Sequence, residues 1–175
     1  YDSELGLSWN KYKDWSKLYH LKELVSLDGS LNGLSFDPDF DSEWQFIITD
    51  KQLITPFFNS KDYLIEKTKH LIQFNFLAVI QEPDKNKASL DENFEFIGYD
   101  LVEKNGDISA LTNCGGFDES FLPKDLNSLG LVTDYFRVKK IQTDLKKYNP
   151  NEEHADCYLY EIWRHKTIGR KTKTA

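Results

Sequence analysis

The chain lacks the features that define several classes of protein. Its 175 residues include only two cysteines, Cys114 and Cys157, which are too few for a scaffold held together by disulfides. The longest apolar run, residues 74–80, contains Asn75 and has only the length of a strand, so we predict no membrane span. The first residues are acidic and lack the basic-then-apolar layout of a secretion signal. We therefore expect a cytoplasmic protein with reduced thiols.

Sequence signatures of common enzymes are also missing. The chain contains no GxSxG motif, no phosphate-binding glycine loop and no dinucleotide-binding fingerprint. The pattern favours a binding protein over an enzyme, and we expect no cofactor.

Basic residues are absent from one long part of the chain, which we call the acidic stretch, Glu23 to Asp50. The net charge is -7, and every charged side chain in this stretch is an acid. Its acids are Glu23, Asp28, Asp37, Asp39, Asp41, Glu43 and Asp50. This charge repels a nucleic-acid backbone and attracts a cationic partner, so we expect neither a nucleic acid nor a membrane as partner.

Aromatic side chains are abundant, with 12 Phe, 9 Tyr and 4 Trp. They bury large areas each, so a core can form without disulfides or a structural metal. The length suits a single domain. We predict one globular α+β domain over residues 1–165, followed by a basic, frayed tail over 166–175.

The periodicity of apolar residues predicts both helices and strands. The expected strands cover residues 43–49, 74–81 and 157–163, and the expected helices cover 9–18, about 60–71 and 135–148. Asp134 is the predicted cap of the last helix, and Asn149 followed by Pro150 ends it. The apolar stripe of that helix is Val138, Ile141, Leu145 and Tyr148.

The clearest local signal is a β-hairpin. Residues 94–103 and 107–112 flank Asn105-Gly106, and Asn-Gly supplies the two positive-φ residues of a tight type I′ turn. Helices and strands interleave without a regular βαβ rhythm. We therefore predict an α+β fold with a mainly antiparallel sheet and helices packed on one face.

Part of the acidic stretch is the candidate site for binding a partner. Aromatic side chains interleave its acids and can serve as anchors. The candidate residues are Asp37, Asp39, Phe40, Asp41, Glu43 and Trp44. An EF-hand is disfavoured, because Ser42 and Ile48 stand where its loop requires Gly and Glu. A solvated acidic loop, with the aromatic residues in the core, is the simpler interpretation.

Cysteine and histidine residues offer an alternative site. Cys114 could act as a nucleophile beside the Gly115-Gly116 amides, with His154 as its base. The same residues together with Cys157 could instead bind zinc. The simpler interpretation is two inert, buried thiols and a pair of glycines that let the chain turn.

A small, acidic, single-domain α+β chain with aromatic and carboxylate residues and no catalytic motif resembles bacterial immunity proteins. Proteins of this class neutralise a partner toxin, often a basic nuclease, in polymorphic or contact-dependent inhibition systems. The resemblance implies a chain that blocks a cognate, basic toxin by occluding its active surface. The segment 109–117 is distinctive, but the sequence assigns no function to it.

Overall fold

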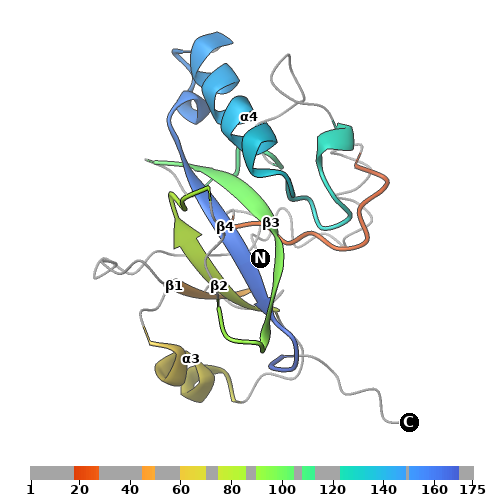
Figure 1. Cartoon of the computed structure of the whole chain (residues 1–175), viewed down its shortest axis with the longest axis vertical. Helices are drawn as coiled ribbons and strands as arrows, with labels where there is room; N and C mark the ends of the chain where they lie inside the picture. Colours follow the sequence, from red (N-terminus) through yellow and green to blue (C-terminus); the bar gives the residue numbers. More distant parts are fainter. Residues whose placement is uncertain are drawn as a thin grey trace, which may run out of the picture.

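The computed structural model describes residues 18–27, 45–49, 60–69, 75–85, 90–104, 108–112, 123–148 and 150–169. The strands described there form a four-stranded sheet in the order β1-β2-β4-β3, and all neighbouring pairs are antiparallel (Figure 1). The elements are β1 (Gln45–Thr49), α3 (Lys61–Thr68), β2 (Asn75–Gln81), β3 (Phe94–Glu103), the 3-10 turn η1 (Pro123–Asp125), α4 (Tyr135–Tyr148), the 3-10 turn η2 (Glu153–Ala155) and β4 (Cys157–His165). None of the described helices is long and apolar enough to cross a membrane.

Both described helices begin at a capping residue, and that of α4, Asp134, is the one that the sequence predicts. The Ser60 side chain accepts a hydrogen bond from the Tyr63 amide at 3.2 Å, and Asp134 Oδ1 accepts one from the Arg137 amide at 2.6 Å. Three residues of the predicted α4 stripe are buried, whereas the fourth, Tyr148, is exposed at the end of the helix. The predicted helix over residues 9–18 lies outside the described residues, apart from Leu18.

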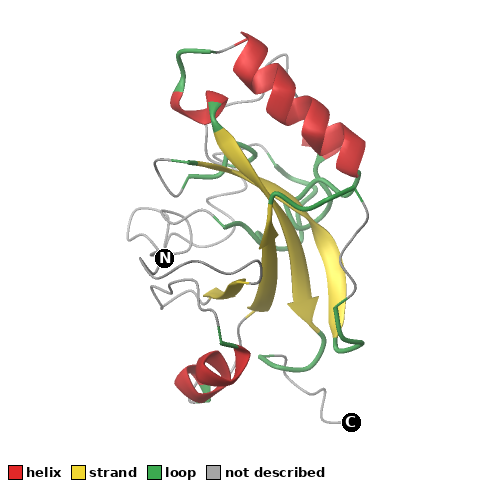
Figure 2. Ribbon diagram, turned by 60° about the vertical axis from the view of Figure 1, so that its left-hand side comes forward, coloured by secondary structure: helices red, strands yellow, loops and turns green. Residues whose placement is uncertain are grey.

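The two helices cover the same face of the sheet, which we call the helix face. α4 lies toward one end of the sheet and α3 toward the other (Figure 2). The α4 stripe packs on β3 and β4, and Leu64 of α3 packs on β2 and β3. The sheet residues beneath them are Phe76, Ala78, Phe94, Tyr99, Leu101 and Leu159, which share one face through the strand alternation and pairing. This arrangement confirms the predicted α+β class.

Residues 25–27 pack on the opposite face of the sheet, whereas Leu18 and Leu21 before them belong to the cluster around α4. Val25 and Leu27 pack there in a cluster with Leu77, Val79 and Ile162. Residues 24–27 lie against the sheet rather than within it, and the Val25 amide donates to the Leu129 carbonyl at 2.9 Å.

The predicted hairpin is wrong in the extent of its second arm. The chain after β3 does return beside it, with the Glu103 amide donating to the Ile108 carbonyl at 2.9 Å and the Ala110 amide to the Leu101 carbonyl at 2.8 Å. The arm then turns away, because the amides of Leu111 and Thr112 donate to the Ser109 hydroxyl instead of continuing a ladder. The main partner of β3 is β4, and the Asn105-Gly106 turn lies outside the described residues.

The packed part of the chain continues beyond residue 165, where the sequence analysis places the start of the tail. The Lys166 amide donates to the Asn93 carbonyl at 2.8 Å, and Ile168 packs on the cluster formed by Leu64 and its neighbours. Residues 170–175 lie outside the described part of the chain.

Candidate partner-binding surface

The predicted docking residues all lie outside the described residues. They are Asp37, Asp39, Phe40, Asp41, Glu43 and Trp44. The structure does describe residues at both ends of the segment that carries them, namely 23–27 before it and β1 after it. The contacts that hold the two ends of this segment therefore lie among the described residues.

The first support is an ion pair at Glu23. Glu23 Oε2 lies 3.5 Å from Arg164 Nη1 of β4, and Glu23 Oε1 accepts a hydrogen bond from the Asn75 side chain at 2.7 Å. Arg164 is only 15% exposed and also binds Glu95 of β3, with its Nη2 at 2.9 Å from the carboxylate. One arginine between two carboxylates leaves the group with a negative charge. The first acid of the stretch therefore fastens the chain to the sheet.

The second support is the buried carboxylate of Asp100 on β3. Its Oδ2 accepts hydrogen bonds from the Leu27 amide at 3.0 Å and, more weakly, from the Ser26 hydroxyl at 3.5 Å. Its Oδ1 accepts from the Leu101 amide at 2.8 Å and the Ser109 hydroxyl at 2.6 Å. These donors compensate the carboxylate for the water it loses on burial. Asp100 thus joins residues 26–27, which precede the predicted docking residues, to Ser109 in the chain after β3.

The far end of the segment is held by the sheet itself. β1 pairs antiparallel with β2 from Gln45 opposite Val79 to Thr49 opposite Asn75. The chain that carries the predicted docking residues therefore starts at a buried carboxylate and ends in a strand of the sheet. Fixed ends lower the conformational entropy that binding through such a segment costs.

The alternative cysteine–histidine site is described only in part. Cys157 is buried, and its thiol donates to the His154 carbonyl, with the sulfur 3.1 Å from the oxygen. Burial raises the pKa of the Cys157 thiol above its usual value, and the charges of Glu103 and Asp100 raise it further. Cys114 lies outside the described residues, and within the described ranges no three His, Cys, Asp or Glu side chains form a metal-binding group. At neutral pH we therefore expect the Cys157 thiol to stay protonated.

Alkylation tests the state of Cys157. In a Cys114→Ser variant, whose remaining cysteine is Cys157, iodoacetamide should react at neutral pH more than about tenfold slower with the folded chain than with the chain unfolded in urea. Burial shields the sulfur from the reagent, and the raised pKa lowers the fraction of reactive thiolate. Mass spectrometry of the quenched reaction gives both rates. Equal rates in the two states would show that the Cys157 thiol is accessible in the folded chain, which would contradict its burial.

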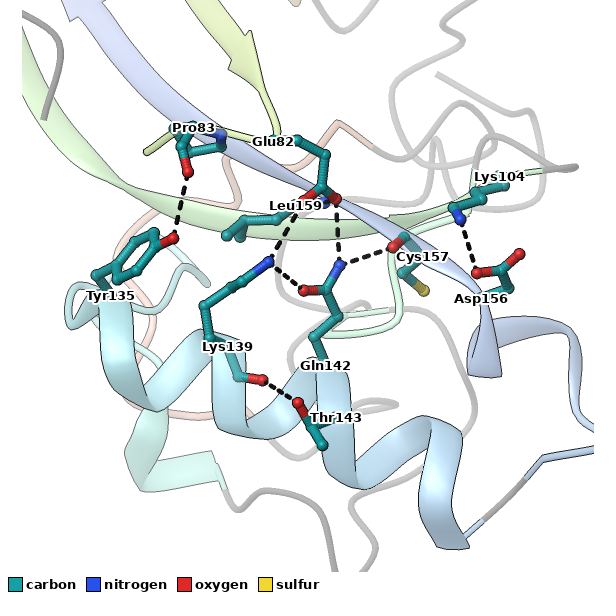
Figure 3. A network of polar contacts seen from close by, with 10 residues as sticks. All are labelled: Glu82, Pro83, Lys104, Tyr135, Lys139, Gln142, Thr143, Asp156, Cys157 and Leu159. Atoms are coloured by element: carbon teal, nitrogen blue, oxygen red, sulfur yellow. Dashed lines mark hydrogen bonds and ion pairs between the residues drawn. The ribbon is translucent and has the colours of Figure 1, made fainter. Parts of the chain in front are cut away.

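A polar network that the sequence does not signal fixes α4 on the sheet (Figure 3). Glu82 follows β2 with a positive φ of 46°, and its carboxylate accepts from the Leu159 amide at 2.7 Å and the Gln142 side chain at 3.2 Å. Gln142 also donates to the Cys157 carbonyl at 2.8 Å, and Lys139 lies 3.3 Å from the Glu82 carboxylate. A glutamate in a polar loop gives no sequence signal for this role.

A buried carboxylate lies on the helix face. Glu161 is fully buried, and its Oε1 accepts a hydrogen bond from Trp163 Nε1 at 2.6 Å. The adjacent Tyr99 hydroxyl is buried without a hydrogen-bond partner among the described residues. Burial and, after it, the charge of Glu161 raise the pKa of Tyr99 to about 12. The tyrosine therefore stays protonated at neutral pH.

Comparisons of this chain with family models, with curated proteins and with solved structures found no match.

Proposed function

We propose that this chain is a protein-binding domain of the immunity-protein kind, which neutralises a cognate basic toxin in the cytoplasm by covering its active surface. The observation that supports this proposal most directly is the acidic stretch, which holds no basic residue. Its two ends are supported by Asp100 and by the pairing of β1 with β2.

Electrostatics explains how such a surface would choose its partner. The acidic stretch has no basic residue within it, so its negative charge should raise the rate of encounter with a cationic protein and disfavour acidic competitors. The energy of the bound state would come mainly from Phe40 and Trp44, since aromatic anchors carry much of the affinity of protein interfaces. A toxin that acts on nucleic acid is a suitable partner, because it must itself be basic around its active surface.

Charge reversal tests the assignment of the docking surface. The triple variant Asp37→Lys, Asp39→Lys, Asp41→Lys should associate with the partner at least about tenfold more slowly at low salt. Its association rate should also depend less on salt, because the steering field is gone. Stopped-flow fluorescence at several salt concentrations measures both effects.

A matched control distinguishes the effect of charges within the acidic stretch from the effect of the net charge of the chain. Asp84, Glu152 and Glu153 are exposed acids outside the acidic stretch. Changing all three to lysine alters the net charge of the chain by the same amount. We expect this control to associate nearly as fast as the parent. If both triple variants slow association equally, or if the first binds as fast as the parent, the acidic stretch is not the docking surface.

A further inference from the structure

His165 ends β4 on the helix face and is 5% exposed. Its ring makes T-shaped contacts with Phe94 of β3, at 4.9 Å between centroids, and with Phe76 of β2, at 5.8 Å. Leu64 of α3 belongs to the same apolar cluster as the two phenylalanines. The imidazole therefore lies where two strands and a helix meet.

The ring also binds the chain that follows it. His165 Nδ1 accepts hydrogen bonds from the Ile168 amide at 3.0 Å and from the Thr167 amide at 3.2 Å. A nitrogen that accepts two N–H groups carries no proton, so the ring is neutral with its hydrogen on Nε2.

We call residues 166–169 the C-terminal segment. Of its backbone amides, that of Lys166 binds the Asn93 carbonyl, whereas those of Thr167 and Ile168 both bind His165 Nδ1. The Ile168 side chain packs on the cluster of Leu64 and the phenylalanines. One ring nitrogen therefore accounts for two of the amide contacts that hold the segment in place.

The charges around His165 oppose a second positive charge there. Lys61 of α3 lies 5.1 Å above the Phe94 ring and 3.3 Å from Asp91, which precedes β3. Lys166 binds the Glu92 carbonyl, and the facing residues of β2 and β3 are the uncharged phenylalanines. Burial lowers the pKa of His165, Lys61 lowers it further, and Asp91 opposes the shift.

We propose that His165 is an acid-sensitive latch, whose neutral ring holds the C-terminal segment on the helix face and whose protonation at Nδ1 releases it. A proton on Nδ1 turns an acceptor into a donor that faces two N–H groups, so both hydrogen bonds break. The cation that forms lies against two phenylalanine rings and near Lys61, and the Thr167 hydroxyl, 3.4 Å from Nδ1, is too distant to compensate fully for its lost hydration. Because the pKa is lowered in the fold, the segment is held above about pH 6.5 and is released as the pH falls through the lowered value.

Hydrogen–deuterium exchange tests the latch in the intact chain. Peptides covering the C-terminal segment should lose at least about tenfold of their protection between about pH 7.5 and about pH 5, after correction for intrinsic exchange. Peptides from α4 should keep their protection over this range, which shows that the fold itself persists. Nitrogen NMR of the His165 ring should give a pKa below 6.5, with the proton of the neutral ring on Nε2.

Two substitutions distinguish the role of Nδ1 as a hydrogen-bond acceptor from the packing of the His165 ring. In His165→Asn the side-chain oxygen takes the position of Nδ1 and does not titrate, so the protection of the segment should not change with pH. In His165→Phe the ring packing is kept and the acceptor is lost, so the segment should be unprotected at both pH values. His154→Gln serves as a control and should behave as the parent.

The latch is supported if the parent loses protection with the midpoint of the His165 titration and the asparagine variant does not. It is overturned if the parent keeps its protection while His165 is protonated. It is also overturned if the asparagine variant loses protection as the parent does. If the phenylalanine variant does not fold, the parent and the asparagine variant still decide between these results.

Discussion

Replacing Asp100 by alanine should lower the free energy of unfolding by about 3–4 kcal/mol, because it leaves several buried hydrogen-bond donors without an acceptor. These donors are the amides of Leu27 and Leu101 and the hydroxyl of Ser109, whereas the Ser26 hydroxyl keeps the Thr112 hydroxyl as a partner at 3.1 Å. Stability of most domains is only about 5–15 kcal/mol, so the variant should fold marginally. Asp100→Asn should lower the free energy of unfolding by less, since it keeps one acceptor oxygen. It should still destabilise the fold, because its NH₂ group would face other donors.

Urea unfolding followed by tryptophan fluorescence measures this loss. Asp84→Ala is the control, because Asp84 is an exposed acid, and it should change the stability by no more than about 0.5 kcal/mol. An Asp100→Ala variant that unfolds at the urea midpoint of the parent would contradict the role of Asp100 as the support that joins the two chain segments.

Substitution of Gly98 is the second change with a large expected effect. Gly98 has φ of 146°, at a register shift of β3, and a Cβ added there would lie 2.6 Å from the Leu131 Cβ and 3.1 Å from the Val132 carbonyl oxygen. The neighbouring backbone cannot withdraw freely, because Tyr99 and Val132 exchange hydrogen bonds at 2.7 Å and 3.1 Å. Gly98→Ala should therefore destabilise the fold by about 3 kcal/mol or more, from strain and overpacking together.

Gly130 provides the matched comparison. It also has a positive φ, of 84°, but the first atom that an added Cβ meets is the end of the Leu24 side chain, at 3.2 Å. A side-chain end can move, so Gly130→Ala should cost only about 1 kcal/mol, mainly through the backbone conformation. The same urea experiment compares the two variants. If Gly98→Ala costs no more than Gly130→Ala, the close approach of residues 131–132 to β3 is not as tight as described.

Local patterns in the sequence predict much of the fold. The cap Asp134 and the positions of the strands β2 and β4 depend on residues a few positions apart, and the structure confirms them. These signals are local because caps and strand faces are determined by near neighbours.

Contacts between residues distant in sequence could not be predicted in this way. Ser109 looks like an ordinary strand residue, yet its hydroxyl donates to Asp100 and accepts hydrogen bonds from the Leu111 and Thr112 amides, which end the returning arm of the hairpin early. Gly98 has no sequence signature that distinguishes it from a glycine in any strand. Its role follows from the approach of Leu131, which depends on the fold as a whole.

The candidate site likewise combines a feature that is visible in the sequence with contacts that are not. The absence of bases from the acidic stretch is visible in the sequence, but the pairing of its first acid with Arg164 is not. Glu23 is not among the predicted docking residues, and in the structure it fastens the chain to β4. The acids that follow it are the ones to which the binding proposal applies.

The central claim is that this chain neutralises a basic partner by direct binding, and inhibition at equal concentrations tests it most directly. The immobilised chain would first capture the partner from a native cell lysate at low salt, and high salt would elute it. The partner's toxic activity would then be assayed while the chain is added in increasing amounts. We expect a basic protein whose activity is abolished at one chain per toxin, and the triple lysine variant at Asp37, Asp39 and Asp41 should inhibit it far more weakly. A partner that binds while remaining fully active, or whose binding is indifferent to salt, would contradict it.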